Sequence, residues 1–462
     1  MKSFGPRFGF AYQMNPKTVI RGGYGIAYTP LKSTGYAGGD QFGITGQASP
    51  SFFNWDNGFP GNLGVSYDPS GQNGNAHLAF IDRSGGRPGM VQNWTLDIQR
   101  QLTKDVLWDI GYVASKGDHL ISTLQHPNQT DPKYLNYGAC LSVLVTEEAT
   151  DSRCAGKPSV ASPFPAFVGL WESDATVGRA LRPYPQVGHF DLNDYSFTPD
   201  KSGSFTYHSL QTKLEKRFSA GLTFLVSYTW SKNLTNSETD ALGGSGFFGT
   251  GNFLAQDNYN RKVEKTLSQL DTPQAVVLSY TYELPIGPGK DLLKIGGAAG
   301  KIVGGWSIAG VQRYQSGIPV GVLATGVNTG LYGKDEWYGA IRANLVPGQQ
   351  LKGFSGHFDP SVNKFLNPAG FAKPPNFSFG SAPIALPGVR TQARSDESFT
   401  LSKRTAITEK VNFMLRGEFF NIFNRTIFSV PSFDVSNPAA FGIISNTYYP
   451  PRRIQVGAKL EF

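Results

Sequence analysis

The feature that most constrains this chain is a two-residue alternation of side chains that recurs along its whole length. In GLTFLVSYTWSK, Leu222, Phe224 and Val226 share one side of an extended segment, and the C-terminal IQVGAKLEF keeps the same pattern up to Phe462. Strict alternation predicts β-strands with one apolar and one polar face. We count eleven such strands, near residues 4–12, 20–28, 93–102, 105–114, 205–218, 222–231, 275–284, 306–314, 398–404, 411–419 and 454–462.

The connections between these strands alternate in length. Short links lie at 15–18, 103–105, 219–221 and 406–410, with a longer one from Pro285 to Gly305. Long links cover 30–91, 116–203, 233–274, 316–390 and 424–451. Strands of about ten residues with short periplasmic turns and long extracellular loops are typical of a transmembrane β-barrel. The sequence therefore predicts an all-β fold, a transmembrane antiparallel β-barrel in the outer membrane of a Gram-negative-type bacterium.

Aromatic residues fall near both ends of the predicted strands. Trp94, Tyr112, Tyr228 and Trp230 lie near the long loops, and Trp108, Trp306, Phe218 and Phe462 lie near the short turns. Two belts of this kind mark the two water interfaces of a membrane wall. The pattern predicts that the apolar faces meet lipid and the polar faces line the lumen.

Composition excludes several other classes of protein. Glycine (55) and proline (30) are frequent and charged residues reach only 16%, which suits strands joined by turn-rich loops. No apolar run approaches the roughly 18 residues of a membrane helix, and the N-terminus lacks the features of a secretory signal. Lysine and arginine are scattered despite a net charge of +8, so no nucleic-acid partner is expected.

An odd number of strands cannot close an antiparallel barrel, because the first and last strands would then run parallel. Single-chain bacterial barrels are even-numbered, and two open edges in lipid would expose unpaired backbone groups. The odd count of about 11 strands therefore predicts a partial barrel. The alternative is a missed strand, for which GAIRANLV (339–346) is the best candidate.

Several segments resemble a known family. GPRFGFAYQMNPKTVIRGGYGIAY, NWTLDIQRQLTKDVLWDIGYVASKGDHL, YHSLQTKLEKRFSAGLTFLVSYTWSKNL, GGWSIAGVQRYQSGIPV and LRGEFFNIFNRTIF are similar to the C-terminal barrel half of TonB-dependent outer-membrane receptors. The similarity is greatest to the Oar-like group, which carries an N-terminal carboxypeptidase-regulatory-like domain. The resemblance implies a 22-strand barrel with a plug, and an N-terminal segment that the TonB protein binds.

The same resemblance bears on domains and partners. It implies that residues 1–462 are a single partial barrel domain from which the plug, the TonB-binding segment and the signal peptide are absent. TonB is then a partner only through that missing N-terminal region. The terminal strand matches the signal that the barrel assembly machinery reads, with Ile454, Val456, Leu460 and Phe462 as its residues.

Six charged residues are predicted to lie on the lumen side of the strands: Asp97, Asp109, Glu283, Arg313, Arg416 and Glu418. Ionisable groups inside a barrel need partners or water, so these residues either line a ligand path or, as we favour, hold the plug or pair across strands. Cys140 and Cys154 lie in the longest loop, where an oxidising compartment favours a disulfide over two unpaired thiols.

No catalytic or metal-binding motif stands out. The six histidines are dispersed, and no glycine-rich stretch has the context of a nucleotide loop or a nucleophile elbow. We expect no cofactor, no metal and no enzymatic activity. Aromatic-rich loop segments at 49–60 and 164–174 are candidates for binding an unknown extracellular ligand, although packing between loops explains them equally well.

Three functions are consistent with these patterns. The leading hypothesis is the barrel portion of a receptor that imports a ligand with energy from TonB. The runner-up is a passive or structural outer-membrane barrel, either porin-like or an adhesive surface protein. A soluble, carbohydrate-active β-protein is the third, and it predicts that Trp108, Phe224 and Tyr282 are buried in a core.

Overall fold

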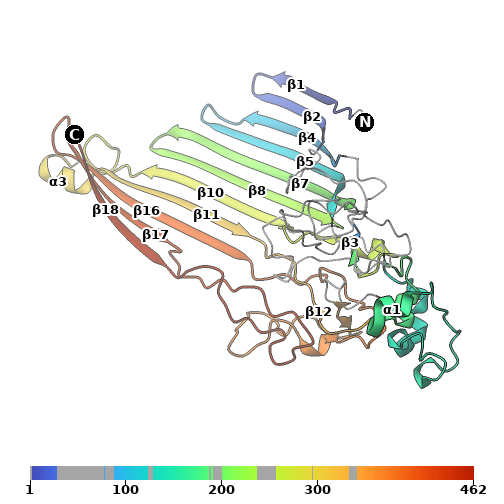
Figure 1. Cartoon of the computed structure of the whole chain (residues 1–462). Helices are drawn as coiled ribbons and strands as arrows, with labels where there is room; N and C mark the ends of the chain where they lie inside the picture. The colour runs from blue at the N-terminus through green and yellow to red at the C-terminus, as the bar shows by residue number, and fades with distance from the viewer. Residues whose placement is uncertain are drawn as a thin grey trace, which may run out of the picture.

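The computed structural model describes residues 3–28, 77–78, 88–122, 128–186, 189–190, 200–236, 256–293, 295–331 and 341–462. Its main feature is one large sheet in which eleven long strands follow each other in chain order and each pairs antiparallel with the next (Figure 1). The strands are β1 (Arg7–Asn15), β2 (Thr18–Tyr28), β4 (Met90–Gln101), β5 (Val106–Ser122), β7 (Asp200–Ser219), β8 (Leu222–Thr235), β10 (Gln274–Glu283), β11 (Trp306–Gln315), β16 (Arg394–Ala406), β17 (Asn412–Phe420) and β18 (Arg453–Glu461). The predicted set of eleven antiparallel strands is confirmed.

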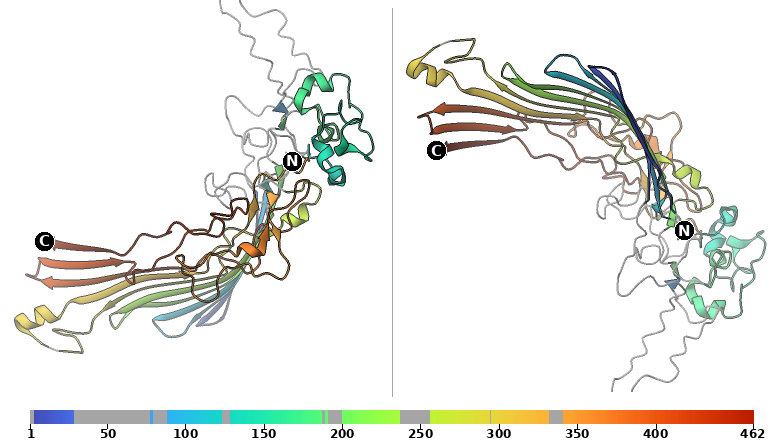
Figure 2. Two further views of the ribbon diagram at one scale, coloured as in Figure 1. Left: turned by 90° about the horizontal axis from the view of Figure 1, so that it is seen from below. Right: turned by 90° about the horizontal axis from the view of Figure 1, so that it is seen from above.

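The sheet is strongly curved, and β1 and β18 lie at its two edges (Figure 2). Short turns join its strands at one end, and the long connections leave from the other end, as predicted. The exception among the short turns is the link from 284 to 305, which contains the helix α3 (Gly297–Val303). No helix in the described part of the chain is long and apolar enough to cross a membrane.

The register shows that the apolar sides of all eleven strands coincide. Directly opposed residues in a sheet share a face, and Val226 is opposed by Leu214 on one side and Leu278 on the other. Following this register across the sheet places one apolar residue of each strand on the same side: Phe8, Ile20, Ile98, Ile110, Leu214, Val226, Leu278, Ile308, Leu401, Leu415 and Val456. We call this side the apolar face and the opposite side the polar face.

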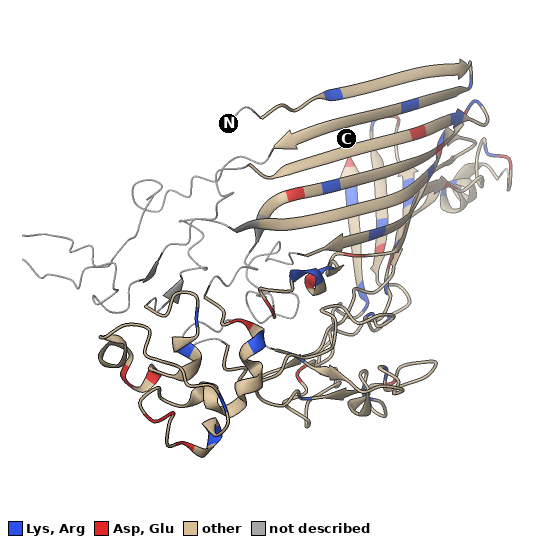
Figure 3. Cartoon of the chain, turned by 90° about the vertical axis from the view of Figure 1, so that its right-hand side faces the viewer, with Lys and Arg blue, Asp and Glu red and all other residues tan. Residues whose placement is uncertain are grey.

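Charged residues on the apolar face lie at its borders. Arg100, Lys216 and Lys403 lie beside the short turns. Lys116, Asp118, Lys232 and Glu397 lie toward the long loops. Long basic side chains at such borders can reach water while their stems stay in an apolar layer. The central band of the face is therefore uncharged, and Figure 3 shows how sparse the charges are along the strands.

One predicted boundary needs correction, and the alternative of a missed wall strand at 339–346 is not supported. β5 and β7 have 17 and 20 residues and continue beyond the predicted ends, so the intervening loop begins later than residue 116. GAIRANLV is not a wall strand: β13 (Ile341–Arg342) pairs with β12 (Leu323–Ala324), and β14 (Asn344–Leu345) pairs with β15 (Phe371–Ala372). Its apolar residues are buried inside the loop assembly, where Ile341 packs near Ala324 and Val327.

The hydrophobic core of the described chain lies in the long loops. Val320, Leu366 and Leu386 pack with Phe441, which joins the loop after β11 to the loop after β17. In the wall, by contrast, Trp108 is 37% exposed, and Phe224 and Tyr282 are only half-buried. The hypothesis of a soluble β-protein predicts that these three residues are buried. Their partial exposure contradicts that hypothesis.

Shorter elements complete the loops. They are β3 (His77–Leu78), η2 (Pro132–Ser142), η3 (Ser152–Cys154), α1 (Phe167–Trp171), η4 (Glu172–Asp174), α2 (Val177–Ala180), β6 (His189–Phe190), η5 (Arg261–Glu264), β9 (Thr266–Leu267) and η6 (Pro368–Gly370). β3 pairs in parallel with β6, and β9 pairs antiparallel with the last residues of β8. These elements give the loop end of the wall a folded structure of its own.

Candidate functional site

The six charged residues predicted for the lumen all lie on the polar face, but they are spread from β4 to β17. Asp97 is opposed by Arg21, and Arg313 is opposed by Asp396. Asp109 lies between Gln99 and Lys213 of the neighbouring strands.

The remaining three are engaged in ion pairs: Arg416 Nη2 lies 2.6 Å from Glu418 Oε1, and Lys290 Nζ lies 3.2 Å from Glu283 Oε2. Each of the six residues thus faces, or pairs with, a polar neighbour. They do not converge on one small-molecule site.

A shallow hollow of about 530 Å³ lies on the polar face over β7 to β17. Hydroxyl-bearing residues line it beside aliphatic ones, and Glu215 and Arg416 are its charged residues. The hydroxyl-bearing residues are Thr223, Ser279, Thr281, Ser398 and Thr400. Such a surface can donate and accept hydrogen bonds without fixing a charge, which suits contact with another polar protein surface or with water.

The most organised polar structure lies in the loops, and the sequence analysis did not find it. The segment 256–273, between β8 and β10, contacts two other loops through buried polar groups. Glu264 and Arg342 form an ion pair of 2.7 Å, with side chains only 1% and 7% exposed. Gln256 joins the same network, because its amide oxygen accepts from the backbone nitrogens of Arg342 at 3.0 Å and Gly380 at 3.2 Å.

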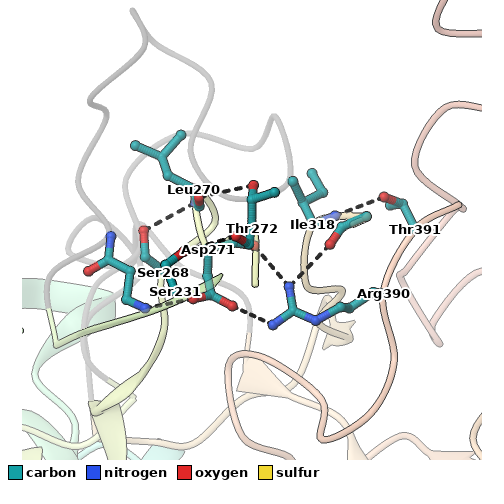
Figure 4. Close-up of polar contacts among 10 residues, drawn as sticks. Ser231, Ser268, Leu270, Asp271, Thr272, Ile318, Arg390 and Thr391 are labelled. Atoms are coloured by element: carbon teal, nitrogen blue, oxygen red, sulfur yellow. Dashed lines mark hydrogen bonds and ion pairs between the residues drawn. The ribbon is translucent and has the colours of Figure 1, made fainter. Parts of the chain in front are cut away.

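A second ion pair joins the same segment to Arg390 in the loop after β11, beside the end of β8 (Figure 4). The carboxylate of Asp271 accepts hydrogen bonds from the Arg390 guanidinium and from the backbone nitrogen of Asn233. Arg390 also donates to the carbonyl oxygens of Asp271 at 2.8 Å and Gly317 at 3.1 Å. A buried charge is tolerated only with partners of this kind, so these contacts hold segment 256–273 against the described part of the loop after β11.

Residues 128–186, in the longest loop, are folded around buried side-chain clusters and contact neighbouring loops. The structure joins Cys140 and Cys154 as a disulfide. Gln129 contacts the segment 256–273, because its Nε2 donates to Asp257 at 2.9 Å. Outside the wall, side-chain and backbone hydrogen bonds from Arg153 lower the pKa of Asp151 to about 2.

Of the two aromatic-rich loop segments, 49–60 lies outside the described residues. In 164–174, Phe167 and Trp171 are buried, and the Arg179 guanidinium lies 3.7 Å from the centre of the Trp171 ring. These aromatic side chains pack within the loop and do not present a face to a ligand.

The outer aromatic belt lies on the apolar face at the loop end. The Tyr112 hydroxyl and His208 Nδ1 are 2.6 Å apart, and Trp94 contacts the same imidazole edge-on. Trp230 lies nearby and lines a groove of about 540 Å³ with Tyr112, His208 and Leu210. Among the residues that the structure describes, no group of three His, Cys, Asp or Glu side chains is placed to hold a metal ion.

A curved antiparallel wall with one apolar face, polar residues opposite and long loops at one end defines a bacterial outer-membrane β-barrel. The sequence matches the outer membrane beta barrel domain over residues 1–455, and the chain belongs to that family. The predicted outer-membrane location is confirmed. The family describes a membrane wall and not a catalytic domain, in agreement with the prediction that the chain is not an enzyme.

Similar folds occur among solved structures. The outer membrane transporter YddB from Escherichia coli has a TM-score of 0.43 at 9% identity, and the match covers 99% of this chain and 40% of YddB. The siderophore receptor PiuA from Acinetobacter baumannii has a TM-score of 0.40 at 9% identity, covering 98% and 35%. The FrpB iron transporter from Neisseria meningitidis has a TM-score of 0.38 at 11% identity, covering 99% and 39%. The chain thus spans well under half the length of these proteins, and no curated protein matches it.

Proposed function

We propose that this chain forms the wall and the external loops of an Oar-like TonB-dependent receptor that imports an extracellular ligand. The observation that carries this proposal is the locked loop assembly at one end of the wall. Buried pairs such as Glu264–Arg342 and Asp271–Arg390 hold several long loops in one arrangement. A preorganised surface lowers the entropic cost of binding a ligand, whereas a passive pore gains nothing from it.

In this proposal residues 1–462 are one barrel domain that supplies eleven of 22 strands. Energy enters through a TonB contact outside these strands, and a plug rests against the polar face. The dispersed lumen charges and the hydroxyl-lined hollow support a broad, hydrated contact with a plug better than a single ligand site. The barrel assembly machinery reads the terminal strand, with Ile454, Val456, Leu460 and Phe462 as its signal.

The experiment that tests this function uses the intact protein purified from outer membranes and inserted into planar bilayers in potassium chloride. A plugged receptor gives no steady ionic current, and the protein should bind the purified C-terminal domain of TonB in solution. Stable open channels together with no TonB binding would establish the passive barrel instead. A protein that gives neither channels nor TonB binding would be a structural barrel, and the import proposal would be wrong.

A further inference from the structure

The link between β10 and β11 is unlike the other turns at its end of the wall. The other four links leave two to five residues between strand ends, but this one has 22 residues, from 284 to 305. It is folded: Leu292 donates its backbone N–H to Pro285 O at 2.8 Å, and Gly287 donates to Leu293 O at 3.2 Å. A Cβ on Gly287 would lie 2.5 Å from Gly304 Cα, so only glycine permits this packing.

Two side chains of the apolar face hold α3 on the membrane-facing side of the wall. Lys403 Nζ donates to the carbonyl oxygens of Lys301, Ile302 and Gly304 at 2.9, 2.7 and 2.7 Å. Trp306 Nε1 donates to Ile302 O at 3.3 Å. Trp306 and Lys403 are direct cross-strand partners in β11 and β16. The last turn of α3 therefore lies against the aromatic residue Trp306 at the short-turn end of the apolar face.

The folded link turns its large aliphatic side chains outward. Leu292, Leu293, Ile295 and Ile302 are between 40 and 70% exposed, whereas Gly300 is buried. Exposing such side chains to water costs about 25 cal/mol per Å² of apolar surface. Trp306 of the apolar face contacts the patch at Ile302, and Lys301 is exposed beside it. Apolar side chains with a lysine at their border suit the boundary between acyl chains and phosphate headgroups.

We propose that the link 284–305 is an interfacial anchor that inserts its apolar side chains into the phospholipid leaflet on the short-turn side of the outer membrane. Lys403 and Trp306 fix its position on the wall. Insertion at one turn pins the depth of β10 and β11 in the bilayer. The proposal rests on the membrane wall and not on the import function, so it stands or falls separately from TonB binding.

The test places a fluorescent probe at the patch. Residues 1–462 contain two cysteines, which the structure pairs with each other, so a cysteine introduced by Ile302→Cys is the only free thiol of these residues for an environment-sensitive NBD label. The labelled intact protein is reconstituted in vesicles of phosphatidylethanolamine and phosphatidylglycerol that carry nitroxide lipids. Val362→Cys is the matched control, because Val362 is 78% exposed in an extracellular loop and Ile302 is 70% exposed.

We expect blue-shifted emission at position 302 and stronger quenching by a nitroxide near the headgroup than by one at the chain end, since interfacial helices lie about 5–10 Å into the headgroup–acyl boundary. A label at position 362 should be quenched by aqueous iodide and not by lipid nitroxides. Adding Lys403→Met should weaken lipid quenching at 302, while heat-modifiable migration on gels shows that the wall is folded. Iodide quenching at 302 equal to that at 362 would overturn the proposal. Blue-shifted emission that lipid nitroxides do not quench would also overturn the proposal, because another protein surface would then cover the patch.

Discussion

At the scale of single residues, Val226 reports which face of the wall meets lipid. It lies on the apolar face between Leu214 and Leu278, four positions after the first residue of the 14-residue strand β8. We expect Val226→Arg to destabilise the inserted protein by up to about 2–4 kcal/mol, because arginine costs that much at the bilayer midplane and less toward the interfaces. Urea unfolding in lipid vesicles measures this loss. Thr229→Arg is the control, because residue 229 is on the polar face opposite Gln211; equal losses for the two variants would mean that the faces are wrongly assigned.

Another residue-scale prediction concerns the pair that links two loops. Arg342→Ala leaves the carboxylate of Glu264 buried without its partner, and removing one member of a buried ion pair typically costs about 3–5 kcal/mol. Hydrogen exchange of segment 256–273 should show this loss as a lower opening free energy. The double variant Glu264→Met, Arg342→Met should recover most of it, because apolar side chains of similar volume need no charged partner. If segment 256–273 exchanges hydrogen equally fast in the single and double variants, the buried lone charge is not the cause of the lost stability.

At the scale of elements, Asp434 connects two long loops in a pH-dependent way. Burial raises the pKa of its carboxyl group, but hydrogen bonds from Thr325 and Ser436 outweigh this effect and hold the pKa below its ordinary value of 3.8. A lowered folded-state pKa means that the carboxylate stabilises the contact above pH 3.8, and that this stabilisation disappears as the pH falls through the folded-state pKa. Protection factors of the Thr325 amide should therefore drop in acid. In Asp434→Asn, which cannot titrate, the drop should be absent.

The disulfide acts on one loop unit. Cys140 and Cys154 are 14 positions apart, and closing a ring of about 15 residues stabilises a fold by about 3 kcal/mol in the chain-entropy account. We expect reductant to speed proteolysis within 128–186 and to leave the heat-modifiable wall intact. The double variant Cys140→Ser, Cys154→Ser should behave like the reduced protein whether or not reductant is present. A wall that unfolds on reduction would show that the loop unit supports the strands, contrary to this prediction.

At the scale of the whole molecule, the wall was predictable and the loops were not. Strand residues such as Val226 have a period of two because each strand lies between two environments. Loop contacts have no such period. Glu264 and Arg342 are 78 residues apart, and the sequence around each residue looks like that of an ordinary solvent-exposed charge. The same limit applies to 339–346, which was the candidate for a missed wall strand. Ile341 and its neighbours alternate like a strand, but their apolar side chains are buried by other loops and not by lipid.

The last prediction concerns how the whole wall reaches the membrane. Phe462 is 96% exposed, so its ring contributes almost nothing to packing within the described chain. If the ring is a recognition element, Phe462→Ala should lower the amount of folded protein in outer membranes several-fold and leave the unfolding midpoint of the inserted fraction unchanged. Phe462→Tyr is the control that keeps an aromatic terminus and should restore assembly. A lowered unfolding midpoint with normal assembly would instead show that Phe462 stabilises the folded wall. The two roles can be told apart here because the ring makes almost no contacts, so its loss should not itself change stability.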